Sequence, residues 1–459
     1  MKERYDCLCI GSGPGGYSAA LRLSCLGKSV AVIDYSKDNI GGVCLNEGCI
    51  PVKAIIKISK MYSELKRKGT SYGFAKDIDR PDMKRIVAYS KDASRILREG
   101  LLYLFKKNNI VFIEQEAELL EDKKIRIGKS KVIGANNIII ATGSKPNELP
   151  QFKFDGERII SSKEAINLDY IPDSILIIGA GAIGLEFASI FCDLGTKVTL
   201  IEMQDQILPG EDKEIALRLE SIFKKRGIEL HTHCEAELVE KGKDKIRVSL
   251  KGRDRKEIEV SLILLAVGRS PNIDKDSFTD LGIEMDNNFV KVDEYMMTTS
   301  SGIYAVGDIT AYPMFAHSAY REAEIASLHI AGKKSNRLNK EDIPKVIYSN
   351  PEVASIGLNE DEARMRRIGY RVLKKYYRAN PYAVLSGHQE GFIKIIVDDN
   401  HNLLGAHILG YEASELIHQF AICKSNNLSI DKIDKTIYAH PTFSEIIKEA
   451  SSSLLGERP

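Results

Sequence analysis

Long hydrophobic segments are absent from this sequence. The longest apolar runs, such as LILLAV (262–267) and ILIIG (175–179), are far shorter than the roughly 20 residues that cross a bilayer. The chain starts Met-Lys-Glu-Arg and continues directly into an apolar segment, YDCLCIG, which leaves no room for a signal peptide. We therefore expect a cytoplasmic protein that neither spans a membrane nor is exported.

An excess of charge of either sign is also absent. The chain has 65 Lys and Arg residues against 64 Asp and Glu residues, which gives a formal net charge of +1. Its basic runs, such as KKRG (224–227) and RMRRIG (364–369), are short and typical of solvated helix faces. A balanced charge gives no electrostatic attraction to nucleic acid or to an anionic membrane, so we expect neither as a partner.

Clusters of metal ligands are missing as well. No second Cys pair or Cys/His cluster stands where it could complete a zinc site with Cys44 and Cys49, so we expect no metal. The usage of cysteine suits a reducing cytosol, in which a paired Cys motif favours catalysis over a structural role. The remaining cysteines stand in apolar surroundings and are expected to be small buried hydrophobic residues: Cys7, Cys9, Cys25, Cys192, Cys234 and Cys423.

The chain is long enough for several domains. Its 459 residues, of which 43% are hydrophobic and 28% charged, exceed one ordinary core, and a usual domain size of about 150 residues suggests about three domains. The first begins with a strand–loop–helix–strand pattern whose loop carries Gly11, Gly13 and Gly16 and whose second strand ends at Asp34. Such glycines permit close approach of a pyrophosphate to the backbone, the helix N-terminus attracts phosphates, and the acid binds ribose hydroxyls. This pattern predicts a dinucleotide site.

The same pattern returns in residues 174–202. Its loop glycines are Gly179, Gly181 and Gly184, and Glu202 closes its second strand. Two such units predict two dinucleotides. The Glu202 carboxylate favours NAD over NADP, because it accepts hydrogen bonds from a free 2′-hydroxyl and repels a 2′-phosphate. The alternative is that another loop supplies a base for that phosphate.

Cys44 and Cys49 follow the first loop, in the run GGVCLNEGCIPVK (41–53). Two thiols so close in sequence beside a flavin form a redox relay, because a disulfide that closes a small loop gains little stability and is easily strained. Asn46 and Gly48 allow the sharp turn that brings the sulfurs together. Two unrelated buried thiols and half of a zinc site are the alternatives.

Two further segments bear on the domain plan. SGIYAVGDIT (301–310) is an apolar strand that ends at Gly307-Asp308, where a carboxylate can hold a ribityl hydroxyl; a plain turn or N-cap acid explains Asp308 equally well. From about residue 339, strands alternate with helices and no glycine-rich loop follows. Such a domain is free to form a subunit interface.

His440, in YAHPTFSEIIKEA (438–450), is the candidate proton carrier of the relay. Thiol–disulfide exchange releases protons near neutral pH, and an imidazole can hold them. Glu445 can orient the imidazole and stabilise its cation. A capping box formed by Thr442 and Glu445 competes with this interpretation, and a lone histidine is more often a surface or cap residue. Both roles of Glu445 require that its two oxygens be shared.

The motifs together resemble a known family. They occur in the order GSGPGG, GGVCLNEGCIP, ATGS, GAGAIGLE, AVGRSPN, YAVGDIT, MFAHSA, NPEVASIG and HPTFSE, and cover essentially the whole chain. This set resembles class I of the flavin-dependent pyridine nucleotide-disulfide oxidoreductases. Leu45 between the cysteines, MFAHSA (314–319) and NPEVASIG (350–357) favour the branch that acts on lipoamide.

The resemblance implies a fold and a domain order. It implies an α/β protein with two Rossmann-like dinucleotide-binding domains, for FAD and NAD, and an α+β C-terminal dimerisation domain. The implied limits are 1–145 for the FAD domain, 146–266 for the NAD domain, 267–338 for a central domain that completes the FAD site, and 339–459 for the interface domain.

The resemblance also implies residue roles. Cys44 is expected to meet the substrate and Cys49 to face the flavin, with Lys53 paired to Glu186. His440 is expected to act across a homodimer interface with Glu445 behind it. The cofactor-binding residues implied beyond the two glycine loops are Asp34, Lys53, Ala117, Thr142, Gly143, Ser144, Glu186, Glu202, Gly268, Asp308, Met314, Ala316 and His317.

The implied activity is oxidation of a protein-bound dihydrolipoyl group, with FAD as the carrier and NAD as the acceptor. The implied partners are a second copy of the chain and the lipoyl domains of 2-oxoacid dehydrogenase or glycine cleavage complexes. The alternatives are reduction of another low-molecular-weight disulfide by NADH, and a non-catalytic scaffold. The chain departs from the family at Val43, Val52, Glu47 and NPYA (380–383), which leaves substrate preference open.

Overall fold

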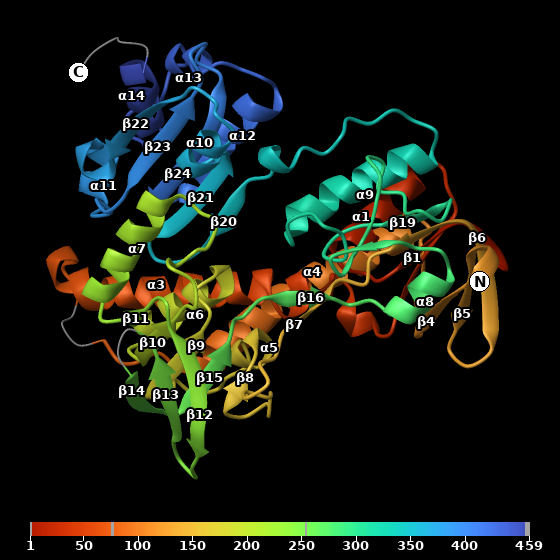
Figure 1. Ribbon diagram of the computed structural model, residues 1–459, viewed down its shortest axis with the longest axis horizontal. Coiled ribbons are helices and arrows are strands. Elements are labelled where there is room, and N and C mark those ends of the chain that lie inside the picture. The colour runs from red at the N-terminus through yellow and green to blue at the C-terminus, as the bar shows by residue number, and fades with distance from the viewer. Residues whose placement is uncertain (1, 75–77, 253–254, 455–459) are drawn as a thin grey trace.

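The structure is a computed structural model that describes residues 2–74, 78–252 and 255–454. Figure 1 shows units built on separate sheets: one in red and orange with turquoise segments, a yellow-green one beside it, and a blue one at the C-terminal end. The predicted fold class is confirmed, whereas the predicted domain limits stay a prediction. No helix within these described ranges is long and apolar enough to cross a membrane.

The first unit is a seven-stranded sheet in the order β3-β2-β1-β6-β5-β4, with β19 beside β6. Strands β1, β2, β3, β6 and β19 run parallel, and β4 and β5 extend the sheet antiparallel. Strand β2, VAVID, is buried at every position, as expected of a parallel strand covered on both faces. The strands are β1 (Arg4–Ile10), β2 (Val30–Asp34), β3 (Val111–Glu114), β4 (Ala117–Leu120), β5 (Lys124–Ile127), β6 (Lys131–Ile140) and β19 (Ile303–Ala305).

Helices cover this sheet and extend toward the second unit. Two long helices, α3 and α4, pack together. Helices α1 and α9 pack side by side although they are far apart in sequence (Figure 1). The helices are α1 (Pro14–Cys25), α2 (Gly42–Asn46), α3 (Cys49–Lys68), α4 (Met83–Lys107) and α9 (Ala316–Ile330).

The second unit repeats the parallel plan in the order β11-β10-β9-β15-β8, with an antiparallel sheet, β12-β13-β14, beside it. An antiparallel pair, β7 with β16, joins it to the first unit. Its helix α6 packs against α3 of the first unit. The strands are β7 (Ser144–Pro146), β8 (Ile159–Ile160), β9 (Ser174–Ile178), β10 (Lys197–Ile201), β11 (Glu229–His231), β12 (Glu235–Lys241), β13 (Ile246–Lys251), β14 (Arg255–Val260), β15 (Leu262–Leu265) and β16 (Arg269–Pro271). The helices are α5 (Ser162–Ala165), α6 (Ala182–Asp193) and α7 (Lys213–Lys225). A short segment that leads back to the first unit carries α8 (Lys275–Asp280), β17 (Met285–Asp286) and β18 (Phe289–Val290).

The third unit is an antiparallel sheet in the order β20-β21-β24-β23-β22. Helices α12 and α14 cover one face, and α7 of the second unit packs against the sheet as well. The strands are β20 (Lys345–Ile347), β21 (Glu352–Gly357), β22 (Arg371–Tyr376), β23 (Phe392–Val397) and β24 (Leu403–Gly410). The helices are α10 (Glu360–Met365), α11 (Pro381–Leu385), α12 (Ala413–Ser425), α13 (Asp431–Asp434) and α14 (Glu445–Leu454).

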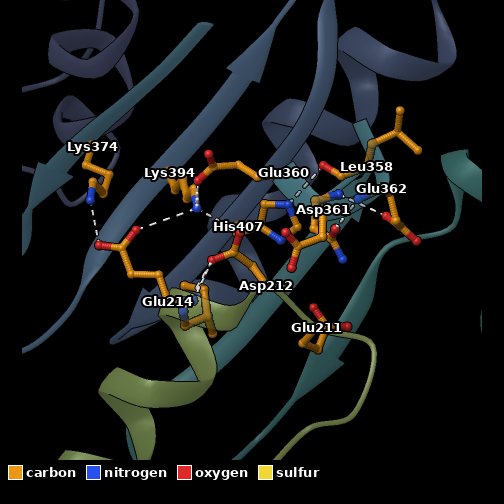
Figure 2. A network of polar contacts seen from close by, with 12 residues as sticks. Glu211, Asp212, Glu214, Leu358, Glu360, Asp361, Glu362, Lys374, Lys394 and His407 are labelled. Carbon is orange, nitrogen blue, oxygen red and sulfur yellow. Dashed lines mark hydrogen bonds and ion pairs between the residues drawn. The ribbon is translucent and has the colours of Figure 1, made fainter. Parts of the chain in front are cut away.

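A buried ion cluster joins the second and third units (Figure 2). Lys394 of β23, with a side chain only 2% exposed, forms ion pairs with Asp212 at 2.8 Å, with Glu214 at 3.5 Å, and with Glu360 of α10. Asp212 is also the N-cap of α7, where its side chain accepts hydrogen bonds from the backbone N–H groups of Glu214 and Ile215. The cluster therefore attaches the start of α7 to the sheet of the third unit.

Candidate active site

A cavity of about 610 Å³ lies where the first and second units meet. Its wall includes the residues that directly follow β1, β6 and β19, and Asp34 at the end of β2. The cysteine segment and the first turns of α6 also contribute to the wall. Parallel sheets bind ligands at the carboxyl ends of their strands, so this position suits a dinucleotide.

The first glycine loop fits a pyrophosphate because side chains have no room there. A Cβ added at Gly11, whose φ is +98°, would lie 2.3 Å from the carbonyl oxygen of Ala141, and one added at Gly16 would lie 1.9 Å from that of Gly11. Gly13 is the N-cap of α1, so the free N–H groups of that helix open toward the cavity. The loop thus offers close backbone contact and a helix N-terminus to a phosphate.

Asp34 holds this loop in place. Its Oδ2 accepts hydrogen bonds from the backbone N–H (2.8 Å) and the hydroxyl (2.6 Å) of Ser12, and its Oδ1 accepts one from Asn39 Nδ2 (2.8 Å). The second loop has the same arrangement, since Glu202 accepts a hydrogen bond from the backbone N–H of Ala180 at 2.8 Å. Both acids stand at the loop edge where ribose hydroxyls are expected.

The second glycine loop repeats the steric pattern. A Cβ at Gly179, whose φ is +101°, would lie 2.5 Å from the carbonyl oxygen of Ala266, and one at Gly184 would lie 1.9 Å from that of Gly179. Gly181 is the N-cap of α6. The second loop therefore offers a second dinucleotide the same kind of support.

The helix between the two cysteines is interrupted. Helix α2 ends at Asn46 and α3 begins at Cys49, with Gly48 as its N-cap in an irregular conformation. Asn46 fastens the turn, because its side-chain amide donates to the carbonyl oxygens of Ile40 and Gly42, both at 3.0 Å. This break places Cys44 and Cys49, both half-buried free thiols, side by side in the cavity wall.

The two thiols differ in acidity. A hydrogen bond from the Cys44 thiol and the charge of Lys53 lower the pKa of Cys49 to about 7, although desolvation and Glu186 oppose them. The same hydrogen bond and desolvation raise the pKa of Cys44. The thiolate of the pair therefore forms at Cys49, which matches the division of roles that the resemblance implies.

Lys53 and Glu186 form an ion pair beside Cys49. The Lys53 ammonium lies 2.9 and 3.0 Å from the two carboxylate oxygens of Glu186. Lys53 comes from α3 and Glu186 from α6, so the pair joins the two dinucleotide-type units at the cavity. Burial lowers the pKa of Lys53, but Glu186 and Cys49 outweigh it, and the net pKa of Lys53 is raised. The ammonium is therefore fully charged at neutral pH.

Asp308 is part of a chain of hydrogen bonds in the cavity wall. Ser144 Oγ donates to Asp308 Oδ2 at 2.5 Å, and Arg269 donates to Ser144 Oγ (2.7 Å) and to its carbonyl oxygen (2.6 Å). The N-cap of α9 is Phe315, so Asp308 does not serve as a cap acid there. Arg269 was missed from the sequence, although the quoted motif AVGRSPN contains it beside Gly268.

His440 and Glu445 lie outside this cavity. His440 is 68% exposed, and its Nδ1 donates to Glu445 Oε1 at 2.8 Å. Glu445 Oε2 accepts a hydrogen bond from the backbone N–H of Thr442 at 2.7 Å, while the Thr442 hydroxyl donates to Ala439. The two oxygens of Glu445 are thus shared between the imidazole and half of the expected capping box, and Nε2 of His440 is left as a proton acceptor.

Not every predicted cofactor residue reaches the cavity. His317 instead donates from Nε2 to the carbonyl oxygen of Pro344 at 2.7 Å. Gly16 packs against the backbone of Gly11 instead of facing the cavity. In the described ranges, no cluster of metal-ligating side chains occurs. The residues that do line the cavity are Gly11, Gly13, Asp34, Cys44, Cys49, Lys53, Ala117, Thr142, Gly143, Ser144, Glu186, Asp308, Met314 and Ala316. Outside its lining are Gly16, Gly179, Gly181, Gly184, Glu202, Gly268, His317, His440 and Glu445.

Comparison with protein-family models gives two matches. Residues 5–323 match pyridine nucleotide-disulphide oxidoreductase, and residues 343–451 match the dimerisation domain of the same family. Among curated proteins, the dihydrolipoyl dehydrogenase of Rhizobium etli is 36% identical and covers 98% of both chains. That of Geobacillus stearothermophilus is 35% identical over 98% of this chain and 96% of its own.

Solved structures agree with this match. The crystal structure of LpdA from Mycobacterium tuberculosis has a TM-score of 0.90 at 28% identity and covers 98% of this chain and 99% of its own. A Cu(II) complex of the HOCl-induced flavoprotein disulfide reductase RclA from Escherichia coli has a TM-score of 0.87 at 25% identity, over 99% of this chain and 100% of its own.

Proposed function

Because the chain belongs to the pyridine nucleotide-disulphide oxidoreductase family, we propose that it is a dihydrolipoyl dehydrogenase, which oxidises a protein-bound dihydrolipoyl group and reduces NAD. The observation that carries this proposal is the pair of adjacent thiols in the cavity wall, with the thiolate at Cys49 beside the Lys53–Glu186 ion pair. A reducing cytoplasm suits a carrier that must cycle through its dithiol form.

The residues of the cavity fit FAD. The Gly11–Gly13 loop and the N-terminus of α1 would hold the pyrophosphate, Asp34 would hold the ribose, and Asp308 would hold the ribityl chain. When bound, FAD supplies a two-electron carrier between the cysteine pair and NAD. The protein supplies orientation, exclusion of water and control of protons.

The thiol half-reaction follows from the cysteine geometry. One substrate thiolate attacks Cys44 of the oxidised pair, a mixed disulfide forms, and Cys49 leaves as a thiolate that Lys53 stabilises. The second substrate thiol then attacks the substrate sulfur of the mixed disulfide and releases Cys44. The substrate becomes a cyclic disulfide, and the reduced pair consists of the Cys44 thiol and the Cys49 thiolate. Of the two substrate protons, one passes to Cys44 and the other to His440.

The match to the dimerisation domain supports a homodimer. We propose that His440 acts on Cys44 of the partner subunit, since its ring is exposed and lies outside the cavity of its own chain. Although desolvation opposes them, the Thr442 backbone and His440 lower the pKa of Glu445, so its carboxylate stays charged at neutral pH and supports an imidazolium. Lipoyl domains of 2-oxoacid dehydrogenase or glycine cleavage complexes are the proposed substrates.

A paired assay tests this function. Purified holoenzyme should form NADH from NAD and dihydrolipoamide, and should reduce glutathione disulfide with NADPH far more slowly. Absence of lipoamide activity together with absence of flavin absorbance would remove the proposal. Strong turnover of glutathione disulfide would instead favour a reductase of small disulfides.

Replacing His440 with Gln should slow reduction of the enzyme by dihydrolipoamide by about 10²–10³-fold, because the step loses its proton acceptor. Oxidation of NADH by an artificial acceptor such as ferricyanide should keep its wild-type rate, since that reaction bypasses the thiols. Stopped-flow measurement of both reactions gives the comparison. An equal loss in the two reactions would indicate a folding or assembly defect and would contradict the assigned role.

Replacing Gly181 with Ala should weaken NAD binding by about ten-fold and leave FAD content and thermal unfolding unchanged. Among the described residues other than its two chain neighbours, none has a heavy atom within 4 Å of a Cβ added at this position, and Gly181 has an ordinary φ of −77°. The fold therefore accepts the methyl group, which occupies the space where a pyrophosphate approaches the loop. Calorimetric titration with NAD measures the effect, and an unchanged Kd would exclude this loop as the NAD site.

A further inference from the structure

A segment of the third unit lies along α6. The backbone N–H of Tyr348 donates to Glu186 Oε1 at 3.1 Å, and that of Asn350 donates to Ser189 Oγ at 3.1 Å. The side chain of Asn350 also donates to Asp193 at 3.2 Å. Glu186, Ser189 and Asp193 share one helix face, so the segment after β20 is held in register against α6 over two turns.

This contact reaches the site of the cysteine pair. The ring centroid of Tyr348 lies 4.6 Å from the Lys53 ammonium, within the range of a cation–π interaction. Val346, two residues before it, lines the cavity. The Lys53 ammonium is therefore held by the Glu186 carboxylate from α6 and by an aromatic ring from the third unit.

The position of that ammonium matters because opposing charges act on Cys49. Lys53 favours the Cys49 thiolate, and Glu186 disfavours it. A small shift of the ammonium toward Glu186 and away from the sulfur changes the balance between them, since Coulomb energy falls with distance. A group that contacts the Lys53 ammonium in addition to the carboxylate restrains its position, and therefore acts on the thiolate without touching it.

We propose that Tyr348 is a positioning residue of the thiol relay, whose ring holds the Lys53 ammonium where it stabilises the Cys49 thiolate. The third unit then contributes to the redox site of its own chain, in addition to forming the dimer. This role rests on the proposed function, because it assumes that the Cys49 thiolate is the working form of the relay.

Other groups also act on Cys49, and the experiment must keep them constant. They are Cys44 on α2, Lys53 on α3, Glu186 on α6, Arg269 on β16, and the tyrosines Tyr17 on α1 and Tyr320 on α9. Substitution at position 348 leaves all of them in place. A change in Cys49 acidity then reports on Tyr348 through Lys53.

The test is a pH titration of the Cys49 thiolate in the flavin-loaded Cys44→Ser protein, followed by the long-wavelength absorbance of a thiolate beside oxidised flavin. The introduced serine retains a hydroxyl donor, and Cys49 is then the single thiol of the pair. The variants at position 348 are Y348F, Y348L, and a series of phenylalanines with increasing ring fluorination, which weakens the negative face of the ring at nearly constant size.

We expect Y348F to match its parent, because the ring is retained. Y348L should lower the fraction of Cys49 thiolate at pH 7 by about two-fold, and the fluorinated series should lower it step by step. A flat response across the fluorinated series would overturn the proposal even if Y348L fails to fold. A parent protein without the absorbance band at any pH would overturn the flavin relay and this role together, whereas a normal band with a flat series would overturn this role alone.

Discussion

Replacing Cys49 with Ser is expected to lower the oxidation of dihydrolipoamide by more than about 10³-fold, with flavin still bound. A serine hydroxyl neither forms a disulfide with Cys44 nor leaves as a stable anion at neutral pH. Helix α3 begins at this residue and Gly48 caps it, so a side chain of nearly the same size preserves the break that shapes the cavity wall. Steady-state NADH formation and the flavin absorbance of the purified variant measure the two parts of the prediction.

A matched control separates this effect from the general loss of a cysteine. Cys25 was expected to be buried, but it is an exposed free thiol because it lies at the end of α1, away from the cavity lining. Cys25→Ser should keep wild-type turnover. Wild-type turnover in Cys49→Ser would refute its role as the thiol that passes electrons to the flavin, and loss of bound flavin would show that the substitution disrupts the cavity instead.

The parts of the site that the sequence predicts best are contiguous. Each glycine loop is a strand, a turn and a helix in direct succession, so the spacing of Gly11 to Gly16 and of Gly179 to Gly184 carries its geometry. The cysteine pair is likewise local, because Asn46 and Gly48 break the helix within the same run. Such features need no knowledge of the remaining chain.

The parts that the sequence does not predict depend on contacts between distant elements. Tyr348 lies almost 300 residues after Lys53 and meets it because the third unit packs on α6. Arg269 reaches Ser144 through the pairing of β16 with β7. The side chain of His317 also depends on such a contact: it reaches the carbonyl oxygen of Pro344, while its neighbour Ala316 lines the cavity, and its predicted cofactor contact stays a prediction. Spacing along the chain contains no signal for such pairings.

The other large expected effect is on the free energy of unfolding, at the buried ion cluster between the second and third units. Replacing Lys394 with Met should lower the free energy of unfolding by about 3 kcal/mol, because it leaves the buried Asp212 carboxylate without its ammonium partner. Asp212 is only 3% exposed, and its 2.8 Å bond to Lys394 is the contact that the substitution removes (Figure 2). Urea denaturation of the flavin-loaded protein measures the loss.

Two controls test whether the loss arises from the buried charge. Lys374 pairs with Glu214 at 2.5 Å, but both side chains are more than one-third exposed, so Lys374→Met should cost less than about 1 kcal/mol. Adding Asp212→Asn to Lys394→Met should recover more than half of the loss, because Asn is neutral and still caps α7. A double variant no more stable than Lys394→Met would show that lost packing, and not an unpaired carboxylate, causes the effect.

The pH dependence of this loss follows from the direction of the pKa shifts. Desolvation raises the pKa of Asp212, but His407 and Lys394 lower it, and the net pKa is below its usual value. Its ion pair therefore stabilises the native protein above a pH of about 4 and is lost as the pH falls below that value. Desolvation lowers the pKa of Lys394, but Asp212 and Glu360 raise it, so this contribution is present below a pH of about 10.5 and is lost as the pH rises through the raised pKa. The difference in the free energy of unfolding between wild type and Lys394→Met should be largest near neutral pH. It should become smaller on acidification, when Asp212 of the variant takes up a proton. A difference that is the same at pH 4 and pH 7 would contradict the view that the charge of Asp212 causes the loss.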